Sequence, residues 1–186
     1  MAENELGTHH WRDDMKFEPY GPFKLPRLDG EIDRSKRNAF WKEIEARHPL
    51  LPDAVGCYIF ALKAAKGIRP WYVGKTERRS FAGETWEPGK LLGYGRVVRK
   101  HKGTPMLFLL AKLTDQGKFA RPTKRKMGAV AALEEMLIAV CLQRNRELLN
   151  KKTTRYLKGL QVPGYLNDNP GARPKSAKAL ARLLKT

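Results

Sequence analysis

Three features that would assign a protein to a familiar class are scarce or missing in this sequence. It has two cysteines, Cys57 and Cys141, both inside apolar runs, so a disulfide framework and a cysteine-ligated zinc site are not expected. No stretch approaches the roughly 20 apolar residues of a membrane-spanning helix. Residues 1 to 15 are polar and acidic, whereas a signal peptide is basic and then apolar, so we expect a cytoplasmic protein.

Acidic residues are also scarce. The chain of 186 residues carries 37 Lys and Arg against 19 Asp and Glu, a formal charge of +18. Repulsion of this size is typical of proteins that bind a polyanion, and nucleic acid is the expected partner. An anionic membrane surface is the alternative, but no basic amphipathic stretch has a strong aromatic face. With 41% hydrophobic residues, the chain has enough apolar material for one folded domain with tails.

The N-terminal residues 1 to 53 are expected to form an irregular arm followed by a helix. Residues 1 to 31 contain three prolines and three glycines. Proline restricts the backbone and glycine frees it, so regular elements are not expected there. Apolar residues at helical spacing between 35 and 48 predict a helix of about three turns, which Pro49 ends.

Three apolar runs predict the strands of a small sheet. Residues 55 to 62 and 71 to 73 are rich in aromatic and β-branched residues. A stretch containing Gly and Pro joins them, which is typical of a β-hairpin. Residues 106 to 113 are strongly apolar and lie between turn signals, so we expect a strand in the middle of the sheet, buried on both faces.

Two helices and a basic extension complete the expected organisation. Pro88 is well placed in a first turn and predicts a helix from 88 to about 100. Residues 129 to 149 lack Gly and Pro and repeat apolar residues at helical spacing, which predicts a long helix. Residues 151 to 186 hold nine Lys or Arg against one acid, so this extension is expected to contact phosphate or to stay solvated.

Two tyrosine tripeptides lie on the predicted hairpin, Gly-Cys-Tyr ending at Tyr58 and Tyr-Val-Gly beginning at Tyr72. Alone, each is consistent with half-buried strand tyrosines whose hydroxyls are solvated. They are followed by Lys75, a basic and partly helical segment, a third strand, a helix that carries Glu134, and then Asn150. The order of these elements and residues resembles the GIY-YIG nuclease superfamily, whose tripeptides are Gly-Ile-Tyr and Tyr-Ile-Gly.

The resemblance covers residues 54 to 150 and implies an α+β fold, with a small three-stranded antiparallel sheet flanked by helices. The arm and helix of 1 to 53 would precede this nuclease core, and the basic extension of 151 to 186 would follow it. Cys57 and Val73 replace the two isoleucines, and both are apolar. The implied activity is hydrolysis of DNA phosphodiester bonds, and the implied partner is duplex DNA.

The family's metal-binding glutamate lies in the pattern Leu-Glu-x-x-Leu-Ile, which falls on Glu134. The resemblance therefore implies Mg²⁺ or Mn²⁺ on Glu134. Its neighbours Leu133 and Leu137 also place it near the apolar face of the helix, where an acid needs a partner or a metal. An ion pair with a nearby Lys or Arg is the alternative. Glu135, about 100° further around the helix, is expected to face solvent.

The resemblance also implies roles for the hairpin residues. Tyr58 would act as general base or orient the attacking water, and Tyr72 would position the phosphate or the water. An ordinary tyrosine pKa of about 10 means that Tyr58 needs assistance, either from a close cation such as Lys75 or by proton transfer through the metal shell. Asn150 corresponds to the asparagine that the family carries later in the chain. We expect both hydroxyls to lie on one face of the sheet, with Glu134 approaching the same space.

The family's helix cation, an Arg followed four residues later by His or Tyr, is where this sequence departs from the pattern. Arg78 and Arg79 have no such partner. Lys90 with Tyr94 keeps the spacing, which places both side chains on one helical face, but lysine lacks the bidentate phosphate contact of arginine. We favour this pair and place Arg96 second, and a basic DNA-facing surface without a catalytic role is the alternative. Arg96 would pair with Lys100 or with His101.

Two other classes of function stay open. A catalytically silent nucleic-acid-binding protein on the same fold would need no carboxylate near phosphate, so Tyr58, Tyr72 and Glu134 favour activity. The charge by itself also permits a ribosome- or RNA-associated protein. Dependence of plasmid nicking on Mg²⁺ separates the silent binding protein from a nuclease.

Overall fold

The computed structural model describes residues 15–150, 154–163 and 174–183. The chain divides into two compact units, Met1–Leu149 and Asn150–Thr186. Within the described ranges, no helix is both long and apolar enough to cross a bilayer. The first unit contains the sheet and both tyrosine tripeptides.

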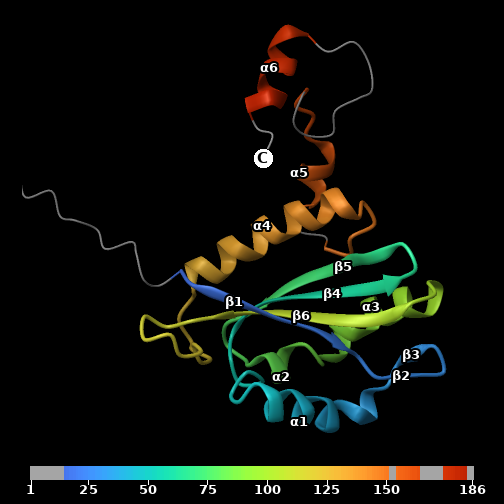
Figure 1. Ribbon diagram of the computed structural model, residues 1–186, viewed down its shortest axis with the longest axis vertical. Coiled ribbons are helices and arrows are strands. Elements are labelled where there is room, and N and C mark those ends of the chain that lie inside the picture. Colours follow the sequence, from blue (N-terminus) through green and yellow to red (C-terminus); the bar gives the residue numbers. More distant parts are fainter. Residues whose placement is uncertain (1–14, 151–153, 164–173, 184–186) are drawn as a thin grey trace, which may run out of the picture. The chain divides into compact units, whose positions relative to one another are not determined.

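A four-stranded antiparallel sheet forms the centre of the first unit (Figure 1). Its strands lie in the order β1 (Phe17–Lys24), β6 (Thr104–Lys112), β4 (Gly56–Ala64) and β5 (Gly67–Thr76). The mixture of helices and antiparallel strands agrees with the sequence prediction. The observed sheet, however, has four strands, one more than the three that were predicted. The apolar β6 lies inside the sheet as expected, and it shares the interior with β4.

The additional strand, β1, comes from a segment predicted to be irregular. Pro19 and Pro22 argue against an interior strand, but β1 pairs only with β6 and lies at the edge of the sheet. A proline is tolerated there because the missing N–H need not belong to a ladder. The register shifts between Tyr20 and Phe23, so an irregularity accommodates the Gly-Pro pair between them.

The predicted hairpin forms, with longer strands than the sequence pattern indicated. β4 and β5 are joined by a tight turn at residues 64 to 67, where Gly67 has a φ of 110°, a conformation that glycine adopts without strain. Pro70 would interrupt an interior strand, but β5 is the other edge of the sheet, so its missing N–H is tolerated.

The segment between β1 and β4 forms the predicted helix. Two short strands, β2 (Arg27–Leu28) and β3 (Glu31–Ile32), precede the helix and pair with each other. A single 3-10 turn, η1 (Arg34–Lys36), leads into α1 (Arg37–Arg47), which ends before Pro49 as predicted.

Between β5 and β6 the chain forms two helices. α3 (Pro88–Lys100) has the predicted bounds, because proline is well tolerated in a first turn. The sequence pattern did not indicate α2 (Phe81–Glu84), a single turn that the Ser80 side chain caps at its N-terminus. Trp86 lies between these helices and is buried in the core.

The long helix α4 (Gly128–Arg144) is shorter than the predicted span of 129 to 149. It ends at Asn145, whose side-chain amide donates a hydrogen bond to the Pro70 carbonyl at 2.7 Å. The chain then follows β5, where the Leu149 N–H donates to a strand carbonyl at 2.8 Å. Contacts with β5 therefore replace the helical hydrogen bonds that the local pattern favoured.

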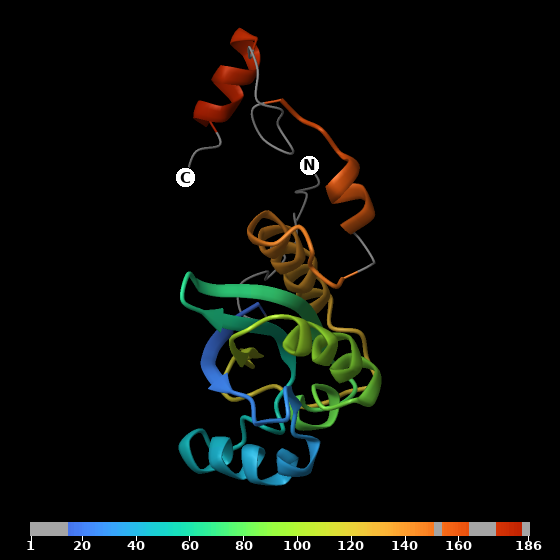
Figure 2. The same cartoon turned by 90° about the vertical axis from the view of Figure 1, so that its right-hand side faces the viewer.

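α3 and α4 cover different parts of the sheet. α3 lies over one face (Figures 1 and 2), and its Tyr94 stacks on Phe60 with ring centroids 4.7 Å apart. α4 runs along β5, and its Val130 carbonyl accepts a hydrogen bond from the Cys57 thiol at 3.3 Å. Alternation along β4 therefore directs Cys57 to α4 and Tyr58 to the α3 face. Cys57 and Cys141 are buried free thiols, as predicted.

The second unit contains two helices among its described residues, α5 (Thr154–Gly159) and α6 (Lys175–Leu183). The sequence pattern indicated only a basic extension in this part of the chain. Asn150 begins the unit, and its carbonyl accepts a hydrogen bond from the Thr154 hydroxyl at 2.5 Å.

Candidate active site

The two motif tyrosines lie side by side on the α3 face of the sheet. The register of the hairpin pairs Tyr58 with Gly74 and Phe60 with Tyr72. Residues directly opposite each other in an antiparallel pair point to the same face, so all three aromatic side chains share one side. The Tyr58 and Tyr72 ring centroids are 6.1 Å apart.

Gly74, the glycine of the second tripeptide, makes room for the Tyr58 ring. A Cβ atom at this position would lie 2.4 Å from both the Cζ and the Oη of Tyr58. Contacts this short force one partner to move, and the Tyr58 ring is fully buried. The two tripeptides are therefore linked physically: the glycine of one allows the tyrosine of the other to lie flat over the strand.

Replacing Gly74 by Ala should destabilise the protein by about 1 to 3 kcal/mol, the usual effect of overpacking a core, and should displace the Tyr58 hydroxyl. Urea unfolding measures the first effect. Gly95→Ala is the control, because nothing lies within 4 Å of a Cβ on this α3 residue, and alanine should stabilise the helix by about 0.5 to 1 kcal/mol. Equal stability of the two variants would contradict the packing described for Gly74.

The Tyr58 hydroxyl is buried and forms no hydrogen bond of standard geometry within the described part of the chain. Burial raises the pKa of Tyr58 well above its ordinary value, and the neighbouring Tyr72 and the charge of Glu134 raise it further. Burial also raises the pKa of Tyr72, and Glu134 acts in the same direction. Both phenols therefore keep their protons at neutral pH and are able to donate hydrogen bonds.

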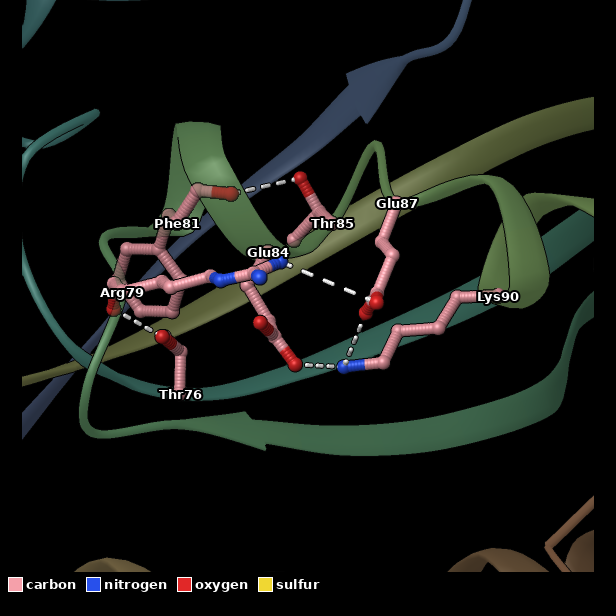
Figure 3. Close-up of polar contacts among 7 residues, drawn as sticks. All are labelled: Thr76, Arg79, Phe81, Glu84, Thr85, Glu87 and Lys90. Atoms are coloured by element: carbon pink, nitrogen blue, oxygen red, sulfur yellow. Dashed lines mark hydrogen bonds and ion pairs between the residues drawn. The ribbon is translucent and has the colours of Figure 1, made fainter.

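Lys90 brings a positive charge to the tyrosines from the first turn of α3. Its Nζ lies 5.7 Å from the Tyr58 ring centroid, over the ring face. It forms ion pairs with Glu84 and, at 3.7 Å, with Glu87, and Figure 3 shows both carboxylates directed at the ammonium. Burial lowers the pKa of Lys90 to about 8, with Arg79 acting in the same direction and Glu134 against it. The adjacent carboxylates also oppose this change, because they favour the ammonium form.

Tyr94 does not join Lys90 beside Tyr58 and Tyr72, contrary to the favoured pairing. It is fully buried, and its hydroxyl donates to the Ala61 carbonyl at 2.5 Å. The spacing of four residues does place both side chains on the side of α3 that faces the sheet. Lys90, however, lies one helical turn before Tyr94. Lys90 lies over the Tyr58 ring, whereas Tyr94 packs on Phe60 in the core.

Arg96, the second candidate for the helix cation, also lies away from the tyrosines. It is exposed, and six residues separate it from Lys90, which turns it by about 240° around the helix axis. The buried residues of α3 occupy the other side. They are Leu91, Tyr94, Val97 and Val98.

Glu134 approaches the edge strand β5 from α4, on the face opposite the tyrosine rings, because its partner Lys75 pairs with Cys57 in the hairpin register and therefore points to the α4 side. Its Oε2 lies 3.4 Å from the Nζ of Lys75, and these side chains are 22% and 32% exposed, respectively. The sequence alternative of an ion pair is therefore observed, with Lys75 as the partner. The charge of Glu134 also raises the pKa values of Tyr58 and Tyr72, so all four groups interact. Glu135 is exposed, as predicted.

A divalent metal would find a single protein carboxylate at this position. In the described residues, no three His, Cys, Asp or Glu side chains are grouped so that they could bind one metal together. Hard cations such as Mg²⁺ accept one carboxylate when water and substrate phosphate supply the remaining ligands. Glu134 fits this role, with the Lys75 ammonium as the cation now beside it. Asn150 belongs to the second compact unit.

Three further charged residues, which the sequence did not predict to lie here, belong to this region: Arg79, Glu84 and Glu87. The Nη1 of Arg79 lies 3.8 Å from Glu87 (Figure 3). These residues line a depression of about 320 Å³ that also contains Lys75. The spacing of Glu87 and Lys90, three residues on one helix, was visible in the sequence. Arg79 and Glu84 precede α3, and only the folded chain places them next to it.

Comparisons of the chain with protein-family models, with curated proteins and with solved structures found no match in any of the three. Function is therefore inferred from the side chains of the cluster and from the sequence.

Proposed function

We propose that this protein is a metal-dependent endonuclease that hydrolyses phosphodiester bonds in duplex DNA. The proposal rests mainly on one observation: two tyrosines, a lysine and a glutamate converge at the edge of the sheet from the β4–β5 hairpin, α3 and α4. These are Tyr58, Tyr72, Lys90 and Glu134. The formal charge of +18 supports a polyanionic substrate.

Each group has a chemical use in phosphodiester hydrolysis. The reaction must orient a water molecule, stabilise the negative charge that builds up on phosphorus, and stabilise the leaving oxygen. Lys90 supplies a partly buried positive charge beside the tyrosines, where its interaction with phosphate is stronger than in water. Tyr72 is placed to donate a hydrogen bond to a phosphate oxygen or to the water.

Tyr58 is better suited to orienting the water than to removing a proton from it by itself. Its raised pKa means that the neutral phenol is the stable form, and a phenol donates one hydrogen bond while accepting others. A role as general base would require the positive charges of the loaded site to lower this pKa. The buried hydroxyl interacts with the Tyr72 side chain but forms no hydrogen bond of standard geometry among the described residues, so it is available to a ligand in either role.

Glu134 would hold the divalent metal, Mg²⁺ or Mn²⁺, through its carboxylate. The metal supplies positive charge at the leaving oxygen and makes a bound water more acidic. Lys75, now paired with Glu134, would then be released toward the phosphate. Its ammonium adds to the positive charge that Lys90 provides.

The same residues support membership in the GIY-YIG superfamily as part of the proposal. Tyr58, Tyr72 and Glu134 hold the positions that the family motifs imply, and Gly74 is required sterically beneath Tyr58. The strand β1 would be an addition to the family's three-stranded sheet. The main departures from the pattern are Lys90 in place of an arginine and the packing of Tyr94, four residues later, on Phe60 in the core.

Nicking of supercoiled plasmid tests the proposal directly. The wild-type protein should convert plasmid to open-circular and linear forms with Mg²⁺ or Mn²⁺ and should leave it intact with EDTA. Binding without cleavage under all metal conditions would instead support the silent nucleic-acid-binding protein. One observation favours that alternative: Lys75 and Lys90 already have carboxylate partners in the folded chain.

Replacing Lys90 by Ala should lower the cleavage rate by about 10²-fold or more, as loss of a preorganised charge in an active site commonly does. Arg96→Ala is the matched control, because it removes one positive charge from the exposed side of the same helix. Its cleavage rate should stay within about threefold of the wild type, with slightly weaker DNA binding. Single-turnover rates at saturating protein measure both. A larger loss for Arg96→Ala than for Lys90→Ala would move the helix cation to Arg96.

A further inference from the structure

A basic cleft lies at the opposite end of β5 from Tyr58, Tyr72 and Lys75. It has a volume of about 480 Å³ and lies around the turn of the β4–β5 hairpin, the C-terminal end of α3 and the last turn of α4. This volume is within the range of clefts that bind small ligands or parts of larger ones. Five basic side chains line it: Lys66, Arg69, His101, Lys102 and Arg144.

No carboxylate lines this cleft among the described residues. The depression beside the tyrosine cluster contains three glutamates, and two other depressions of the first unit each contain at least one acid. Arg69 does form an ion pair with Glu147 at 3.2 Å, but both side chains are about half exposed, where such pairs contribute little. The net charge of the cleft is therefore strongly positive.

Trp71 also lines the cleft. It is buried, its ring lies 4.7 Å from the His101 ring, and the Arg69 guanidinium lies 5.0 Å from its centroid.

We propose that this cleft binds a backbone phosphate of the DNA at a distance from the bond that is cut. Five basic side chains with one half-exposed acidic neighbour, Glu147, suit a phosphodiester, which carries a full negative charge and several acceptor oxygens. Trp71 is too deeply buried to stack on a base. The cleft therefore contacts the backbone independently of sequence and sets the position of the duplex on the protein.

The strand β5 connects this cleft with the tyrosine cluster and sets the spacing between them. Arg69 and Lys75 are six residues apart on β5, a distance of about 20 Å along a strand. This length corresponds to about six base pairs of B-DNA along the helix axis. A duplex that lies along β5 would place one phosphate at the cluster and another, roughly half a turn away, at the cleft. This spacing rests on the proposed nuclease function, whereas phosphate binding by the cleft does not.

Loss of two cleft lysines tests the inference. Lys66→Ala/Lys102→Ala removes two positive charges from the cleft, and Lys36→Ala/Lys42→Ala removes two from η1 and α1, on the other side of the sheet from β5 (Figure 1). All four side chains are exposed, so thermal unfolding should be unchanged. Fluorescence anisotropy of a labelled duplex of about 20 base pairs, recorded in EDTA over a salt series, measures the number of phosphate contacts.

The slope of log K against log salt is negative, and the cleft variant should make it shallower by about 1.8, which is about 0.9 per lost contact. The control should leave the slope unchanged. Equal slopes for the cleft variant and the wild type, or equal losses in both variants, would overturn the inference. EDTA separates it from the proposed nuclease function: a reduced slope with no cleavage in Mg²⁺ would keep the cleft and reject the catalysis. A wild-type protein that binds no duplex would reject both.

Discussion

Replacing Glu134 by Gln should abolish Mg²⁺-dependent cleavage of DNA while leaving binding in EDTA close to that of the wild type. The substitution keeps the shape of the side chain and removes the one charged oxygen ligand that α4 supplies to the cluster. Metal-ion catalysis is worth several kcal/mol, and each 1.36 kcal/mol corresponds to about a tenfold change in rate. We therefore expect a loss of about a thousandfold or more.

Metal-free binding should be unchanged or slightly tighter in Glu134→Gln, because a negative charge is removed and Lys75 loses its partner at 3.4 Å. Glu135→Gln is the matched control: it makes the same chemical change at the next residue, where the side chain is exposed. Plasmid nicking with Mg²⁺ and anisotropy with EDTA measure the two effects. Retained cleavage in Glu134→Gln together with loss in Glu135→Gln would move the metal site to Glu135.

Replacing Tyr58 by Phe should lower the cleavage rate by about 10²-fold or more, because loss of a group that orients the attacking water misplaces a reacting atom. Stability should not fall. The Tyr58 hydroxyl is buried and has no hydrogen-bond partner of standard geometry among the described residues. Burial of an unsatisfied hydroxyl costs about 1 to 3 kcal/mol, so its removal should leave the free energy of unfolding equal or higher.

Tyr94→Phe, on the same face of the sheet, should have the opposite effects: a lower free energy of unfolding and an unchanged cleavage rate. Its hydroxyl donates to the Ala61 carbonyl, and loss of this bond should destabilise the fold by about 1 kcal/mol with little change in the rate. Urea unfolding and single-turnover cleavage, measured for both variants, give four values. Wild-type cleavage by Tyr58→Phe would show that this hydroxyl has no part in the reaction, and a rate loss confined to Tyr94→Phe would restore Tyr94 to the active site.

The sequence spacing of Lys90 and Tyr94 did not distinguish a residue of the candidate site from a residue of the core. Lys90 and Tyr94 are four residues apart and do share the side of α3 that faces the sheet. The sequence could not show which aromatic ring each would meet: in the folded chain Lys90 lies over the Tyr58 ring, and Tyr94 stacks on Phe60.

Local sequence determined the elements that carry the candidate site. Alternation along β4 directed Tyr58 and Cys57 to opposite faces of the sheet. Pro88 began α3 at the predicted residue. Rotation by one helical position left Glu135 exposed and Glu134 partly buried. These features depend on residues a few positions apart, because strand period, helix period and proline restriction act over that range. The positive charge that points to a nucleic-acid partner is also a property of the sequence alone.

The tertiary structure decided what depends on position in the sheet. Pro19 and Pro70 are compatible with strands only because β1 and β5 occupy the edges, and the strand order is not written in either segment. α4 ends at Asn145 because the Pro70 carbonyl, far away in the sequence, accepts its amide. The carboxylates around Lys90 likewise meet it only after α2 and α3 pack together. A hydrogen bond or ion pair between distant segments has no local signature, so the folded chain alone reveals it.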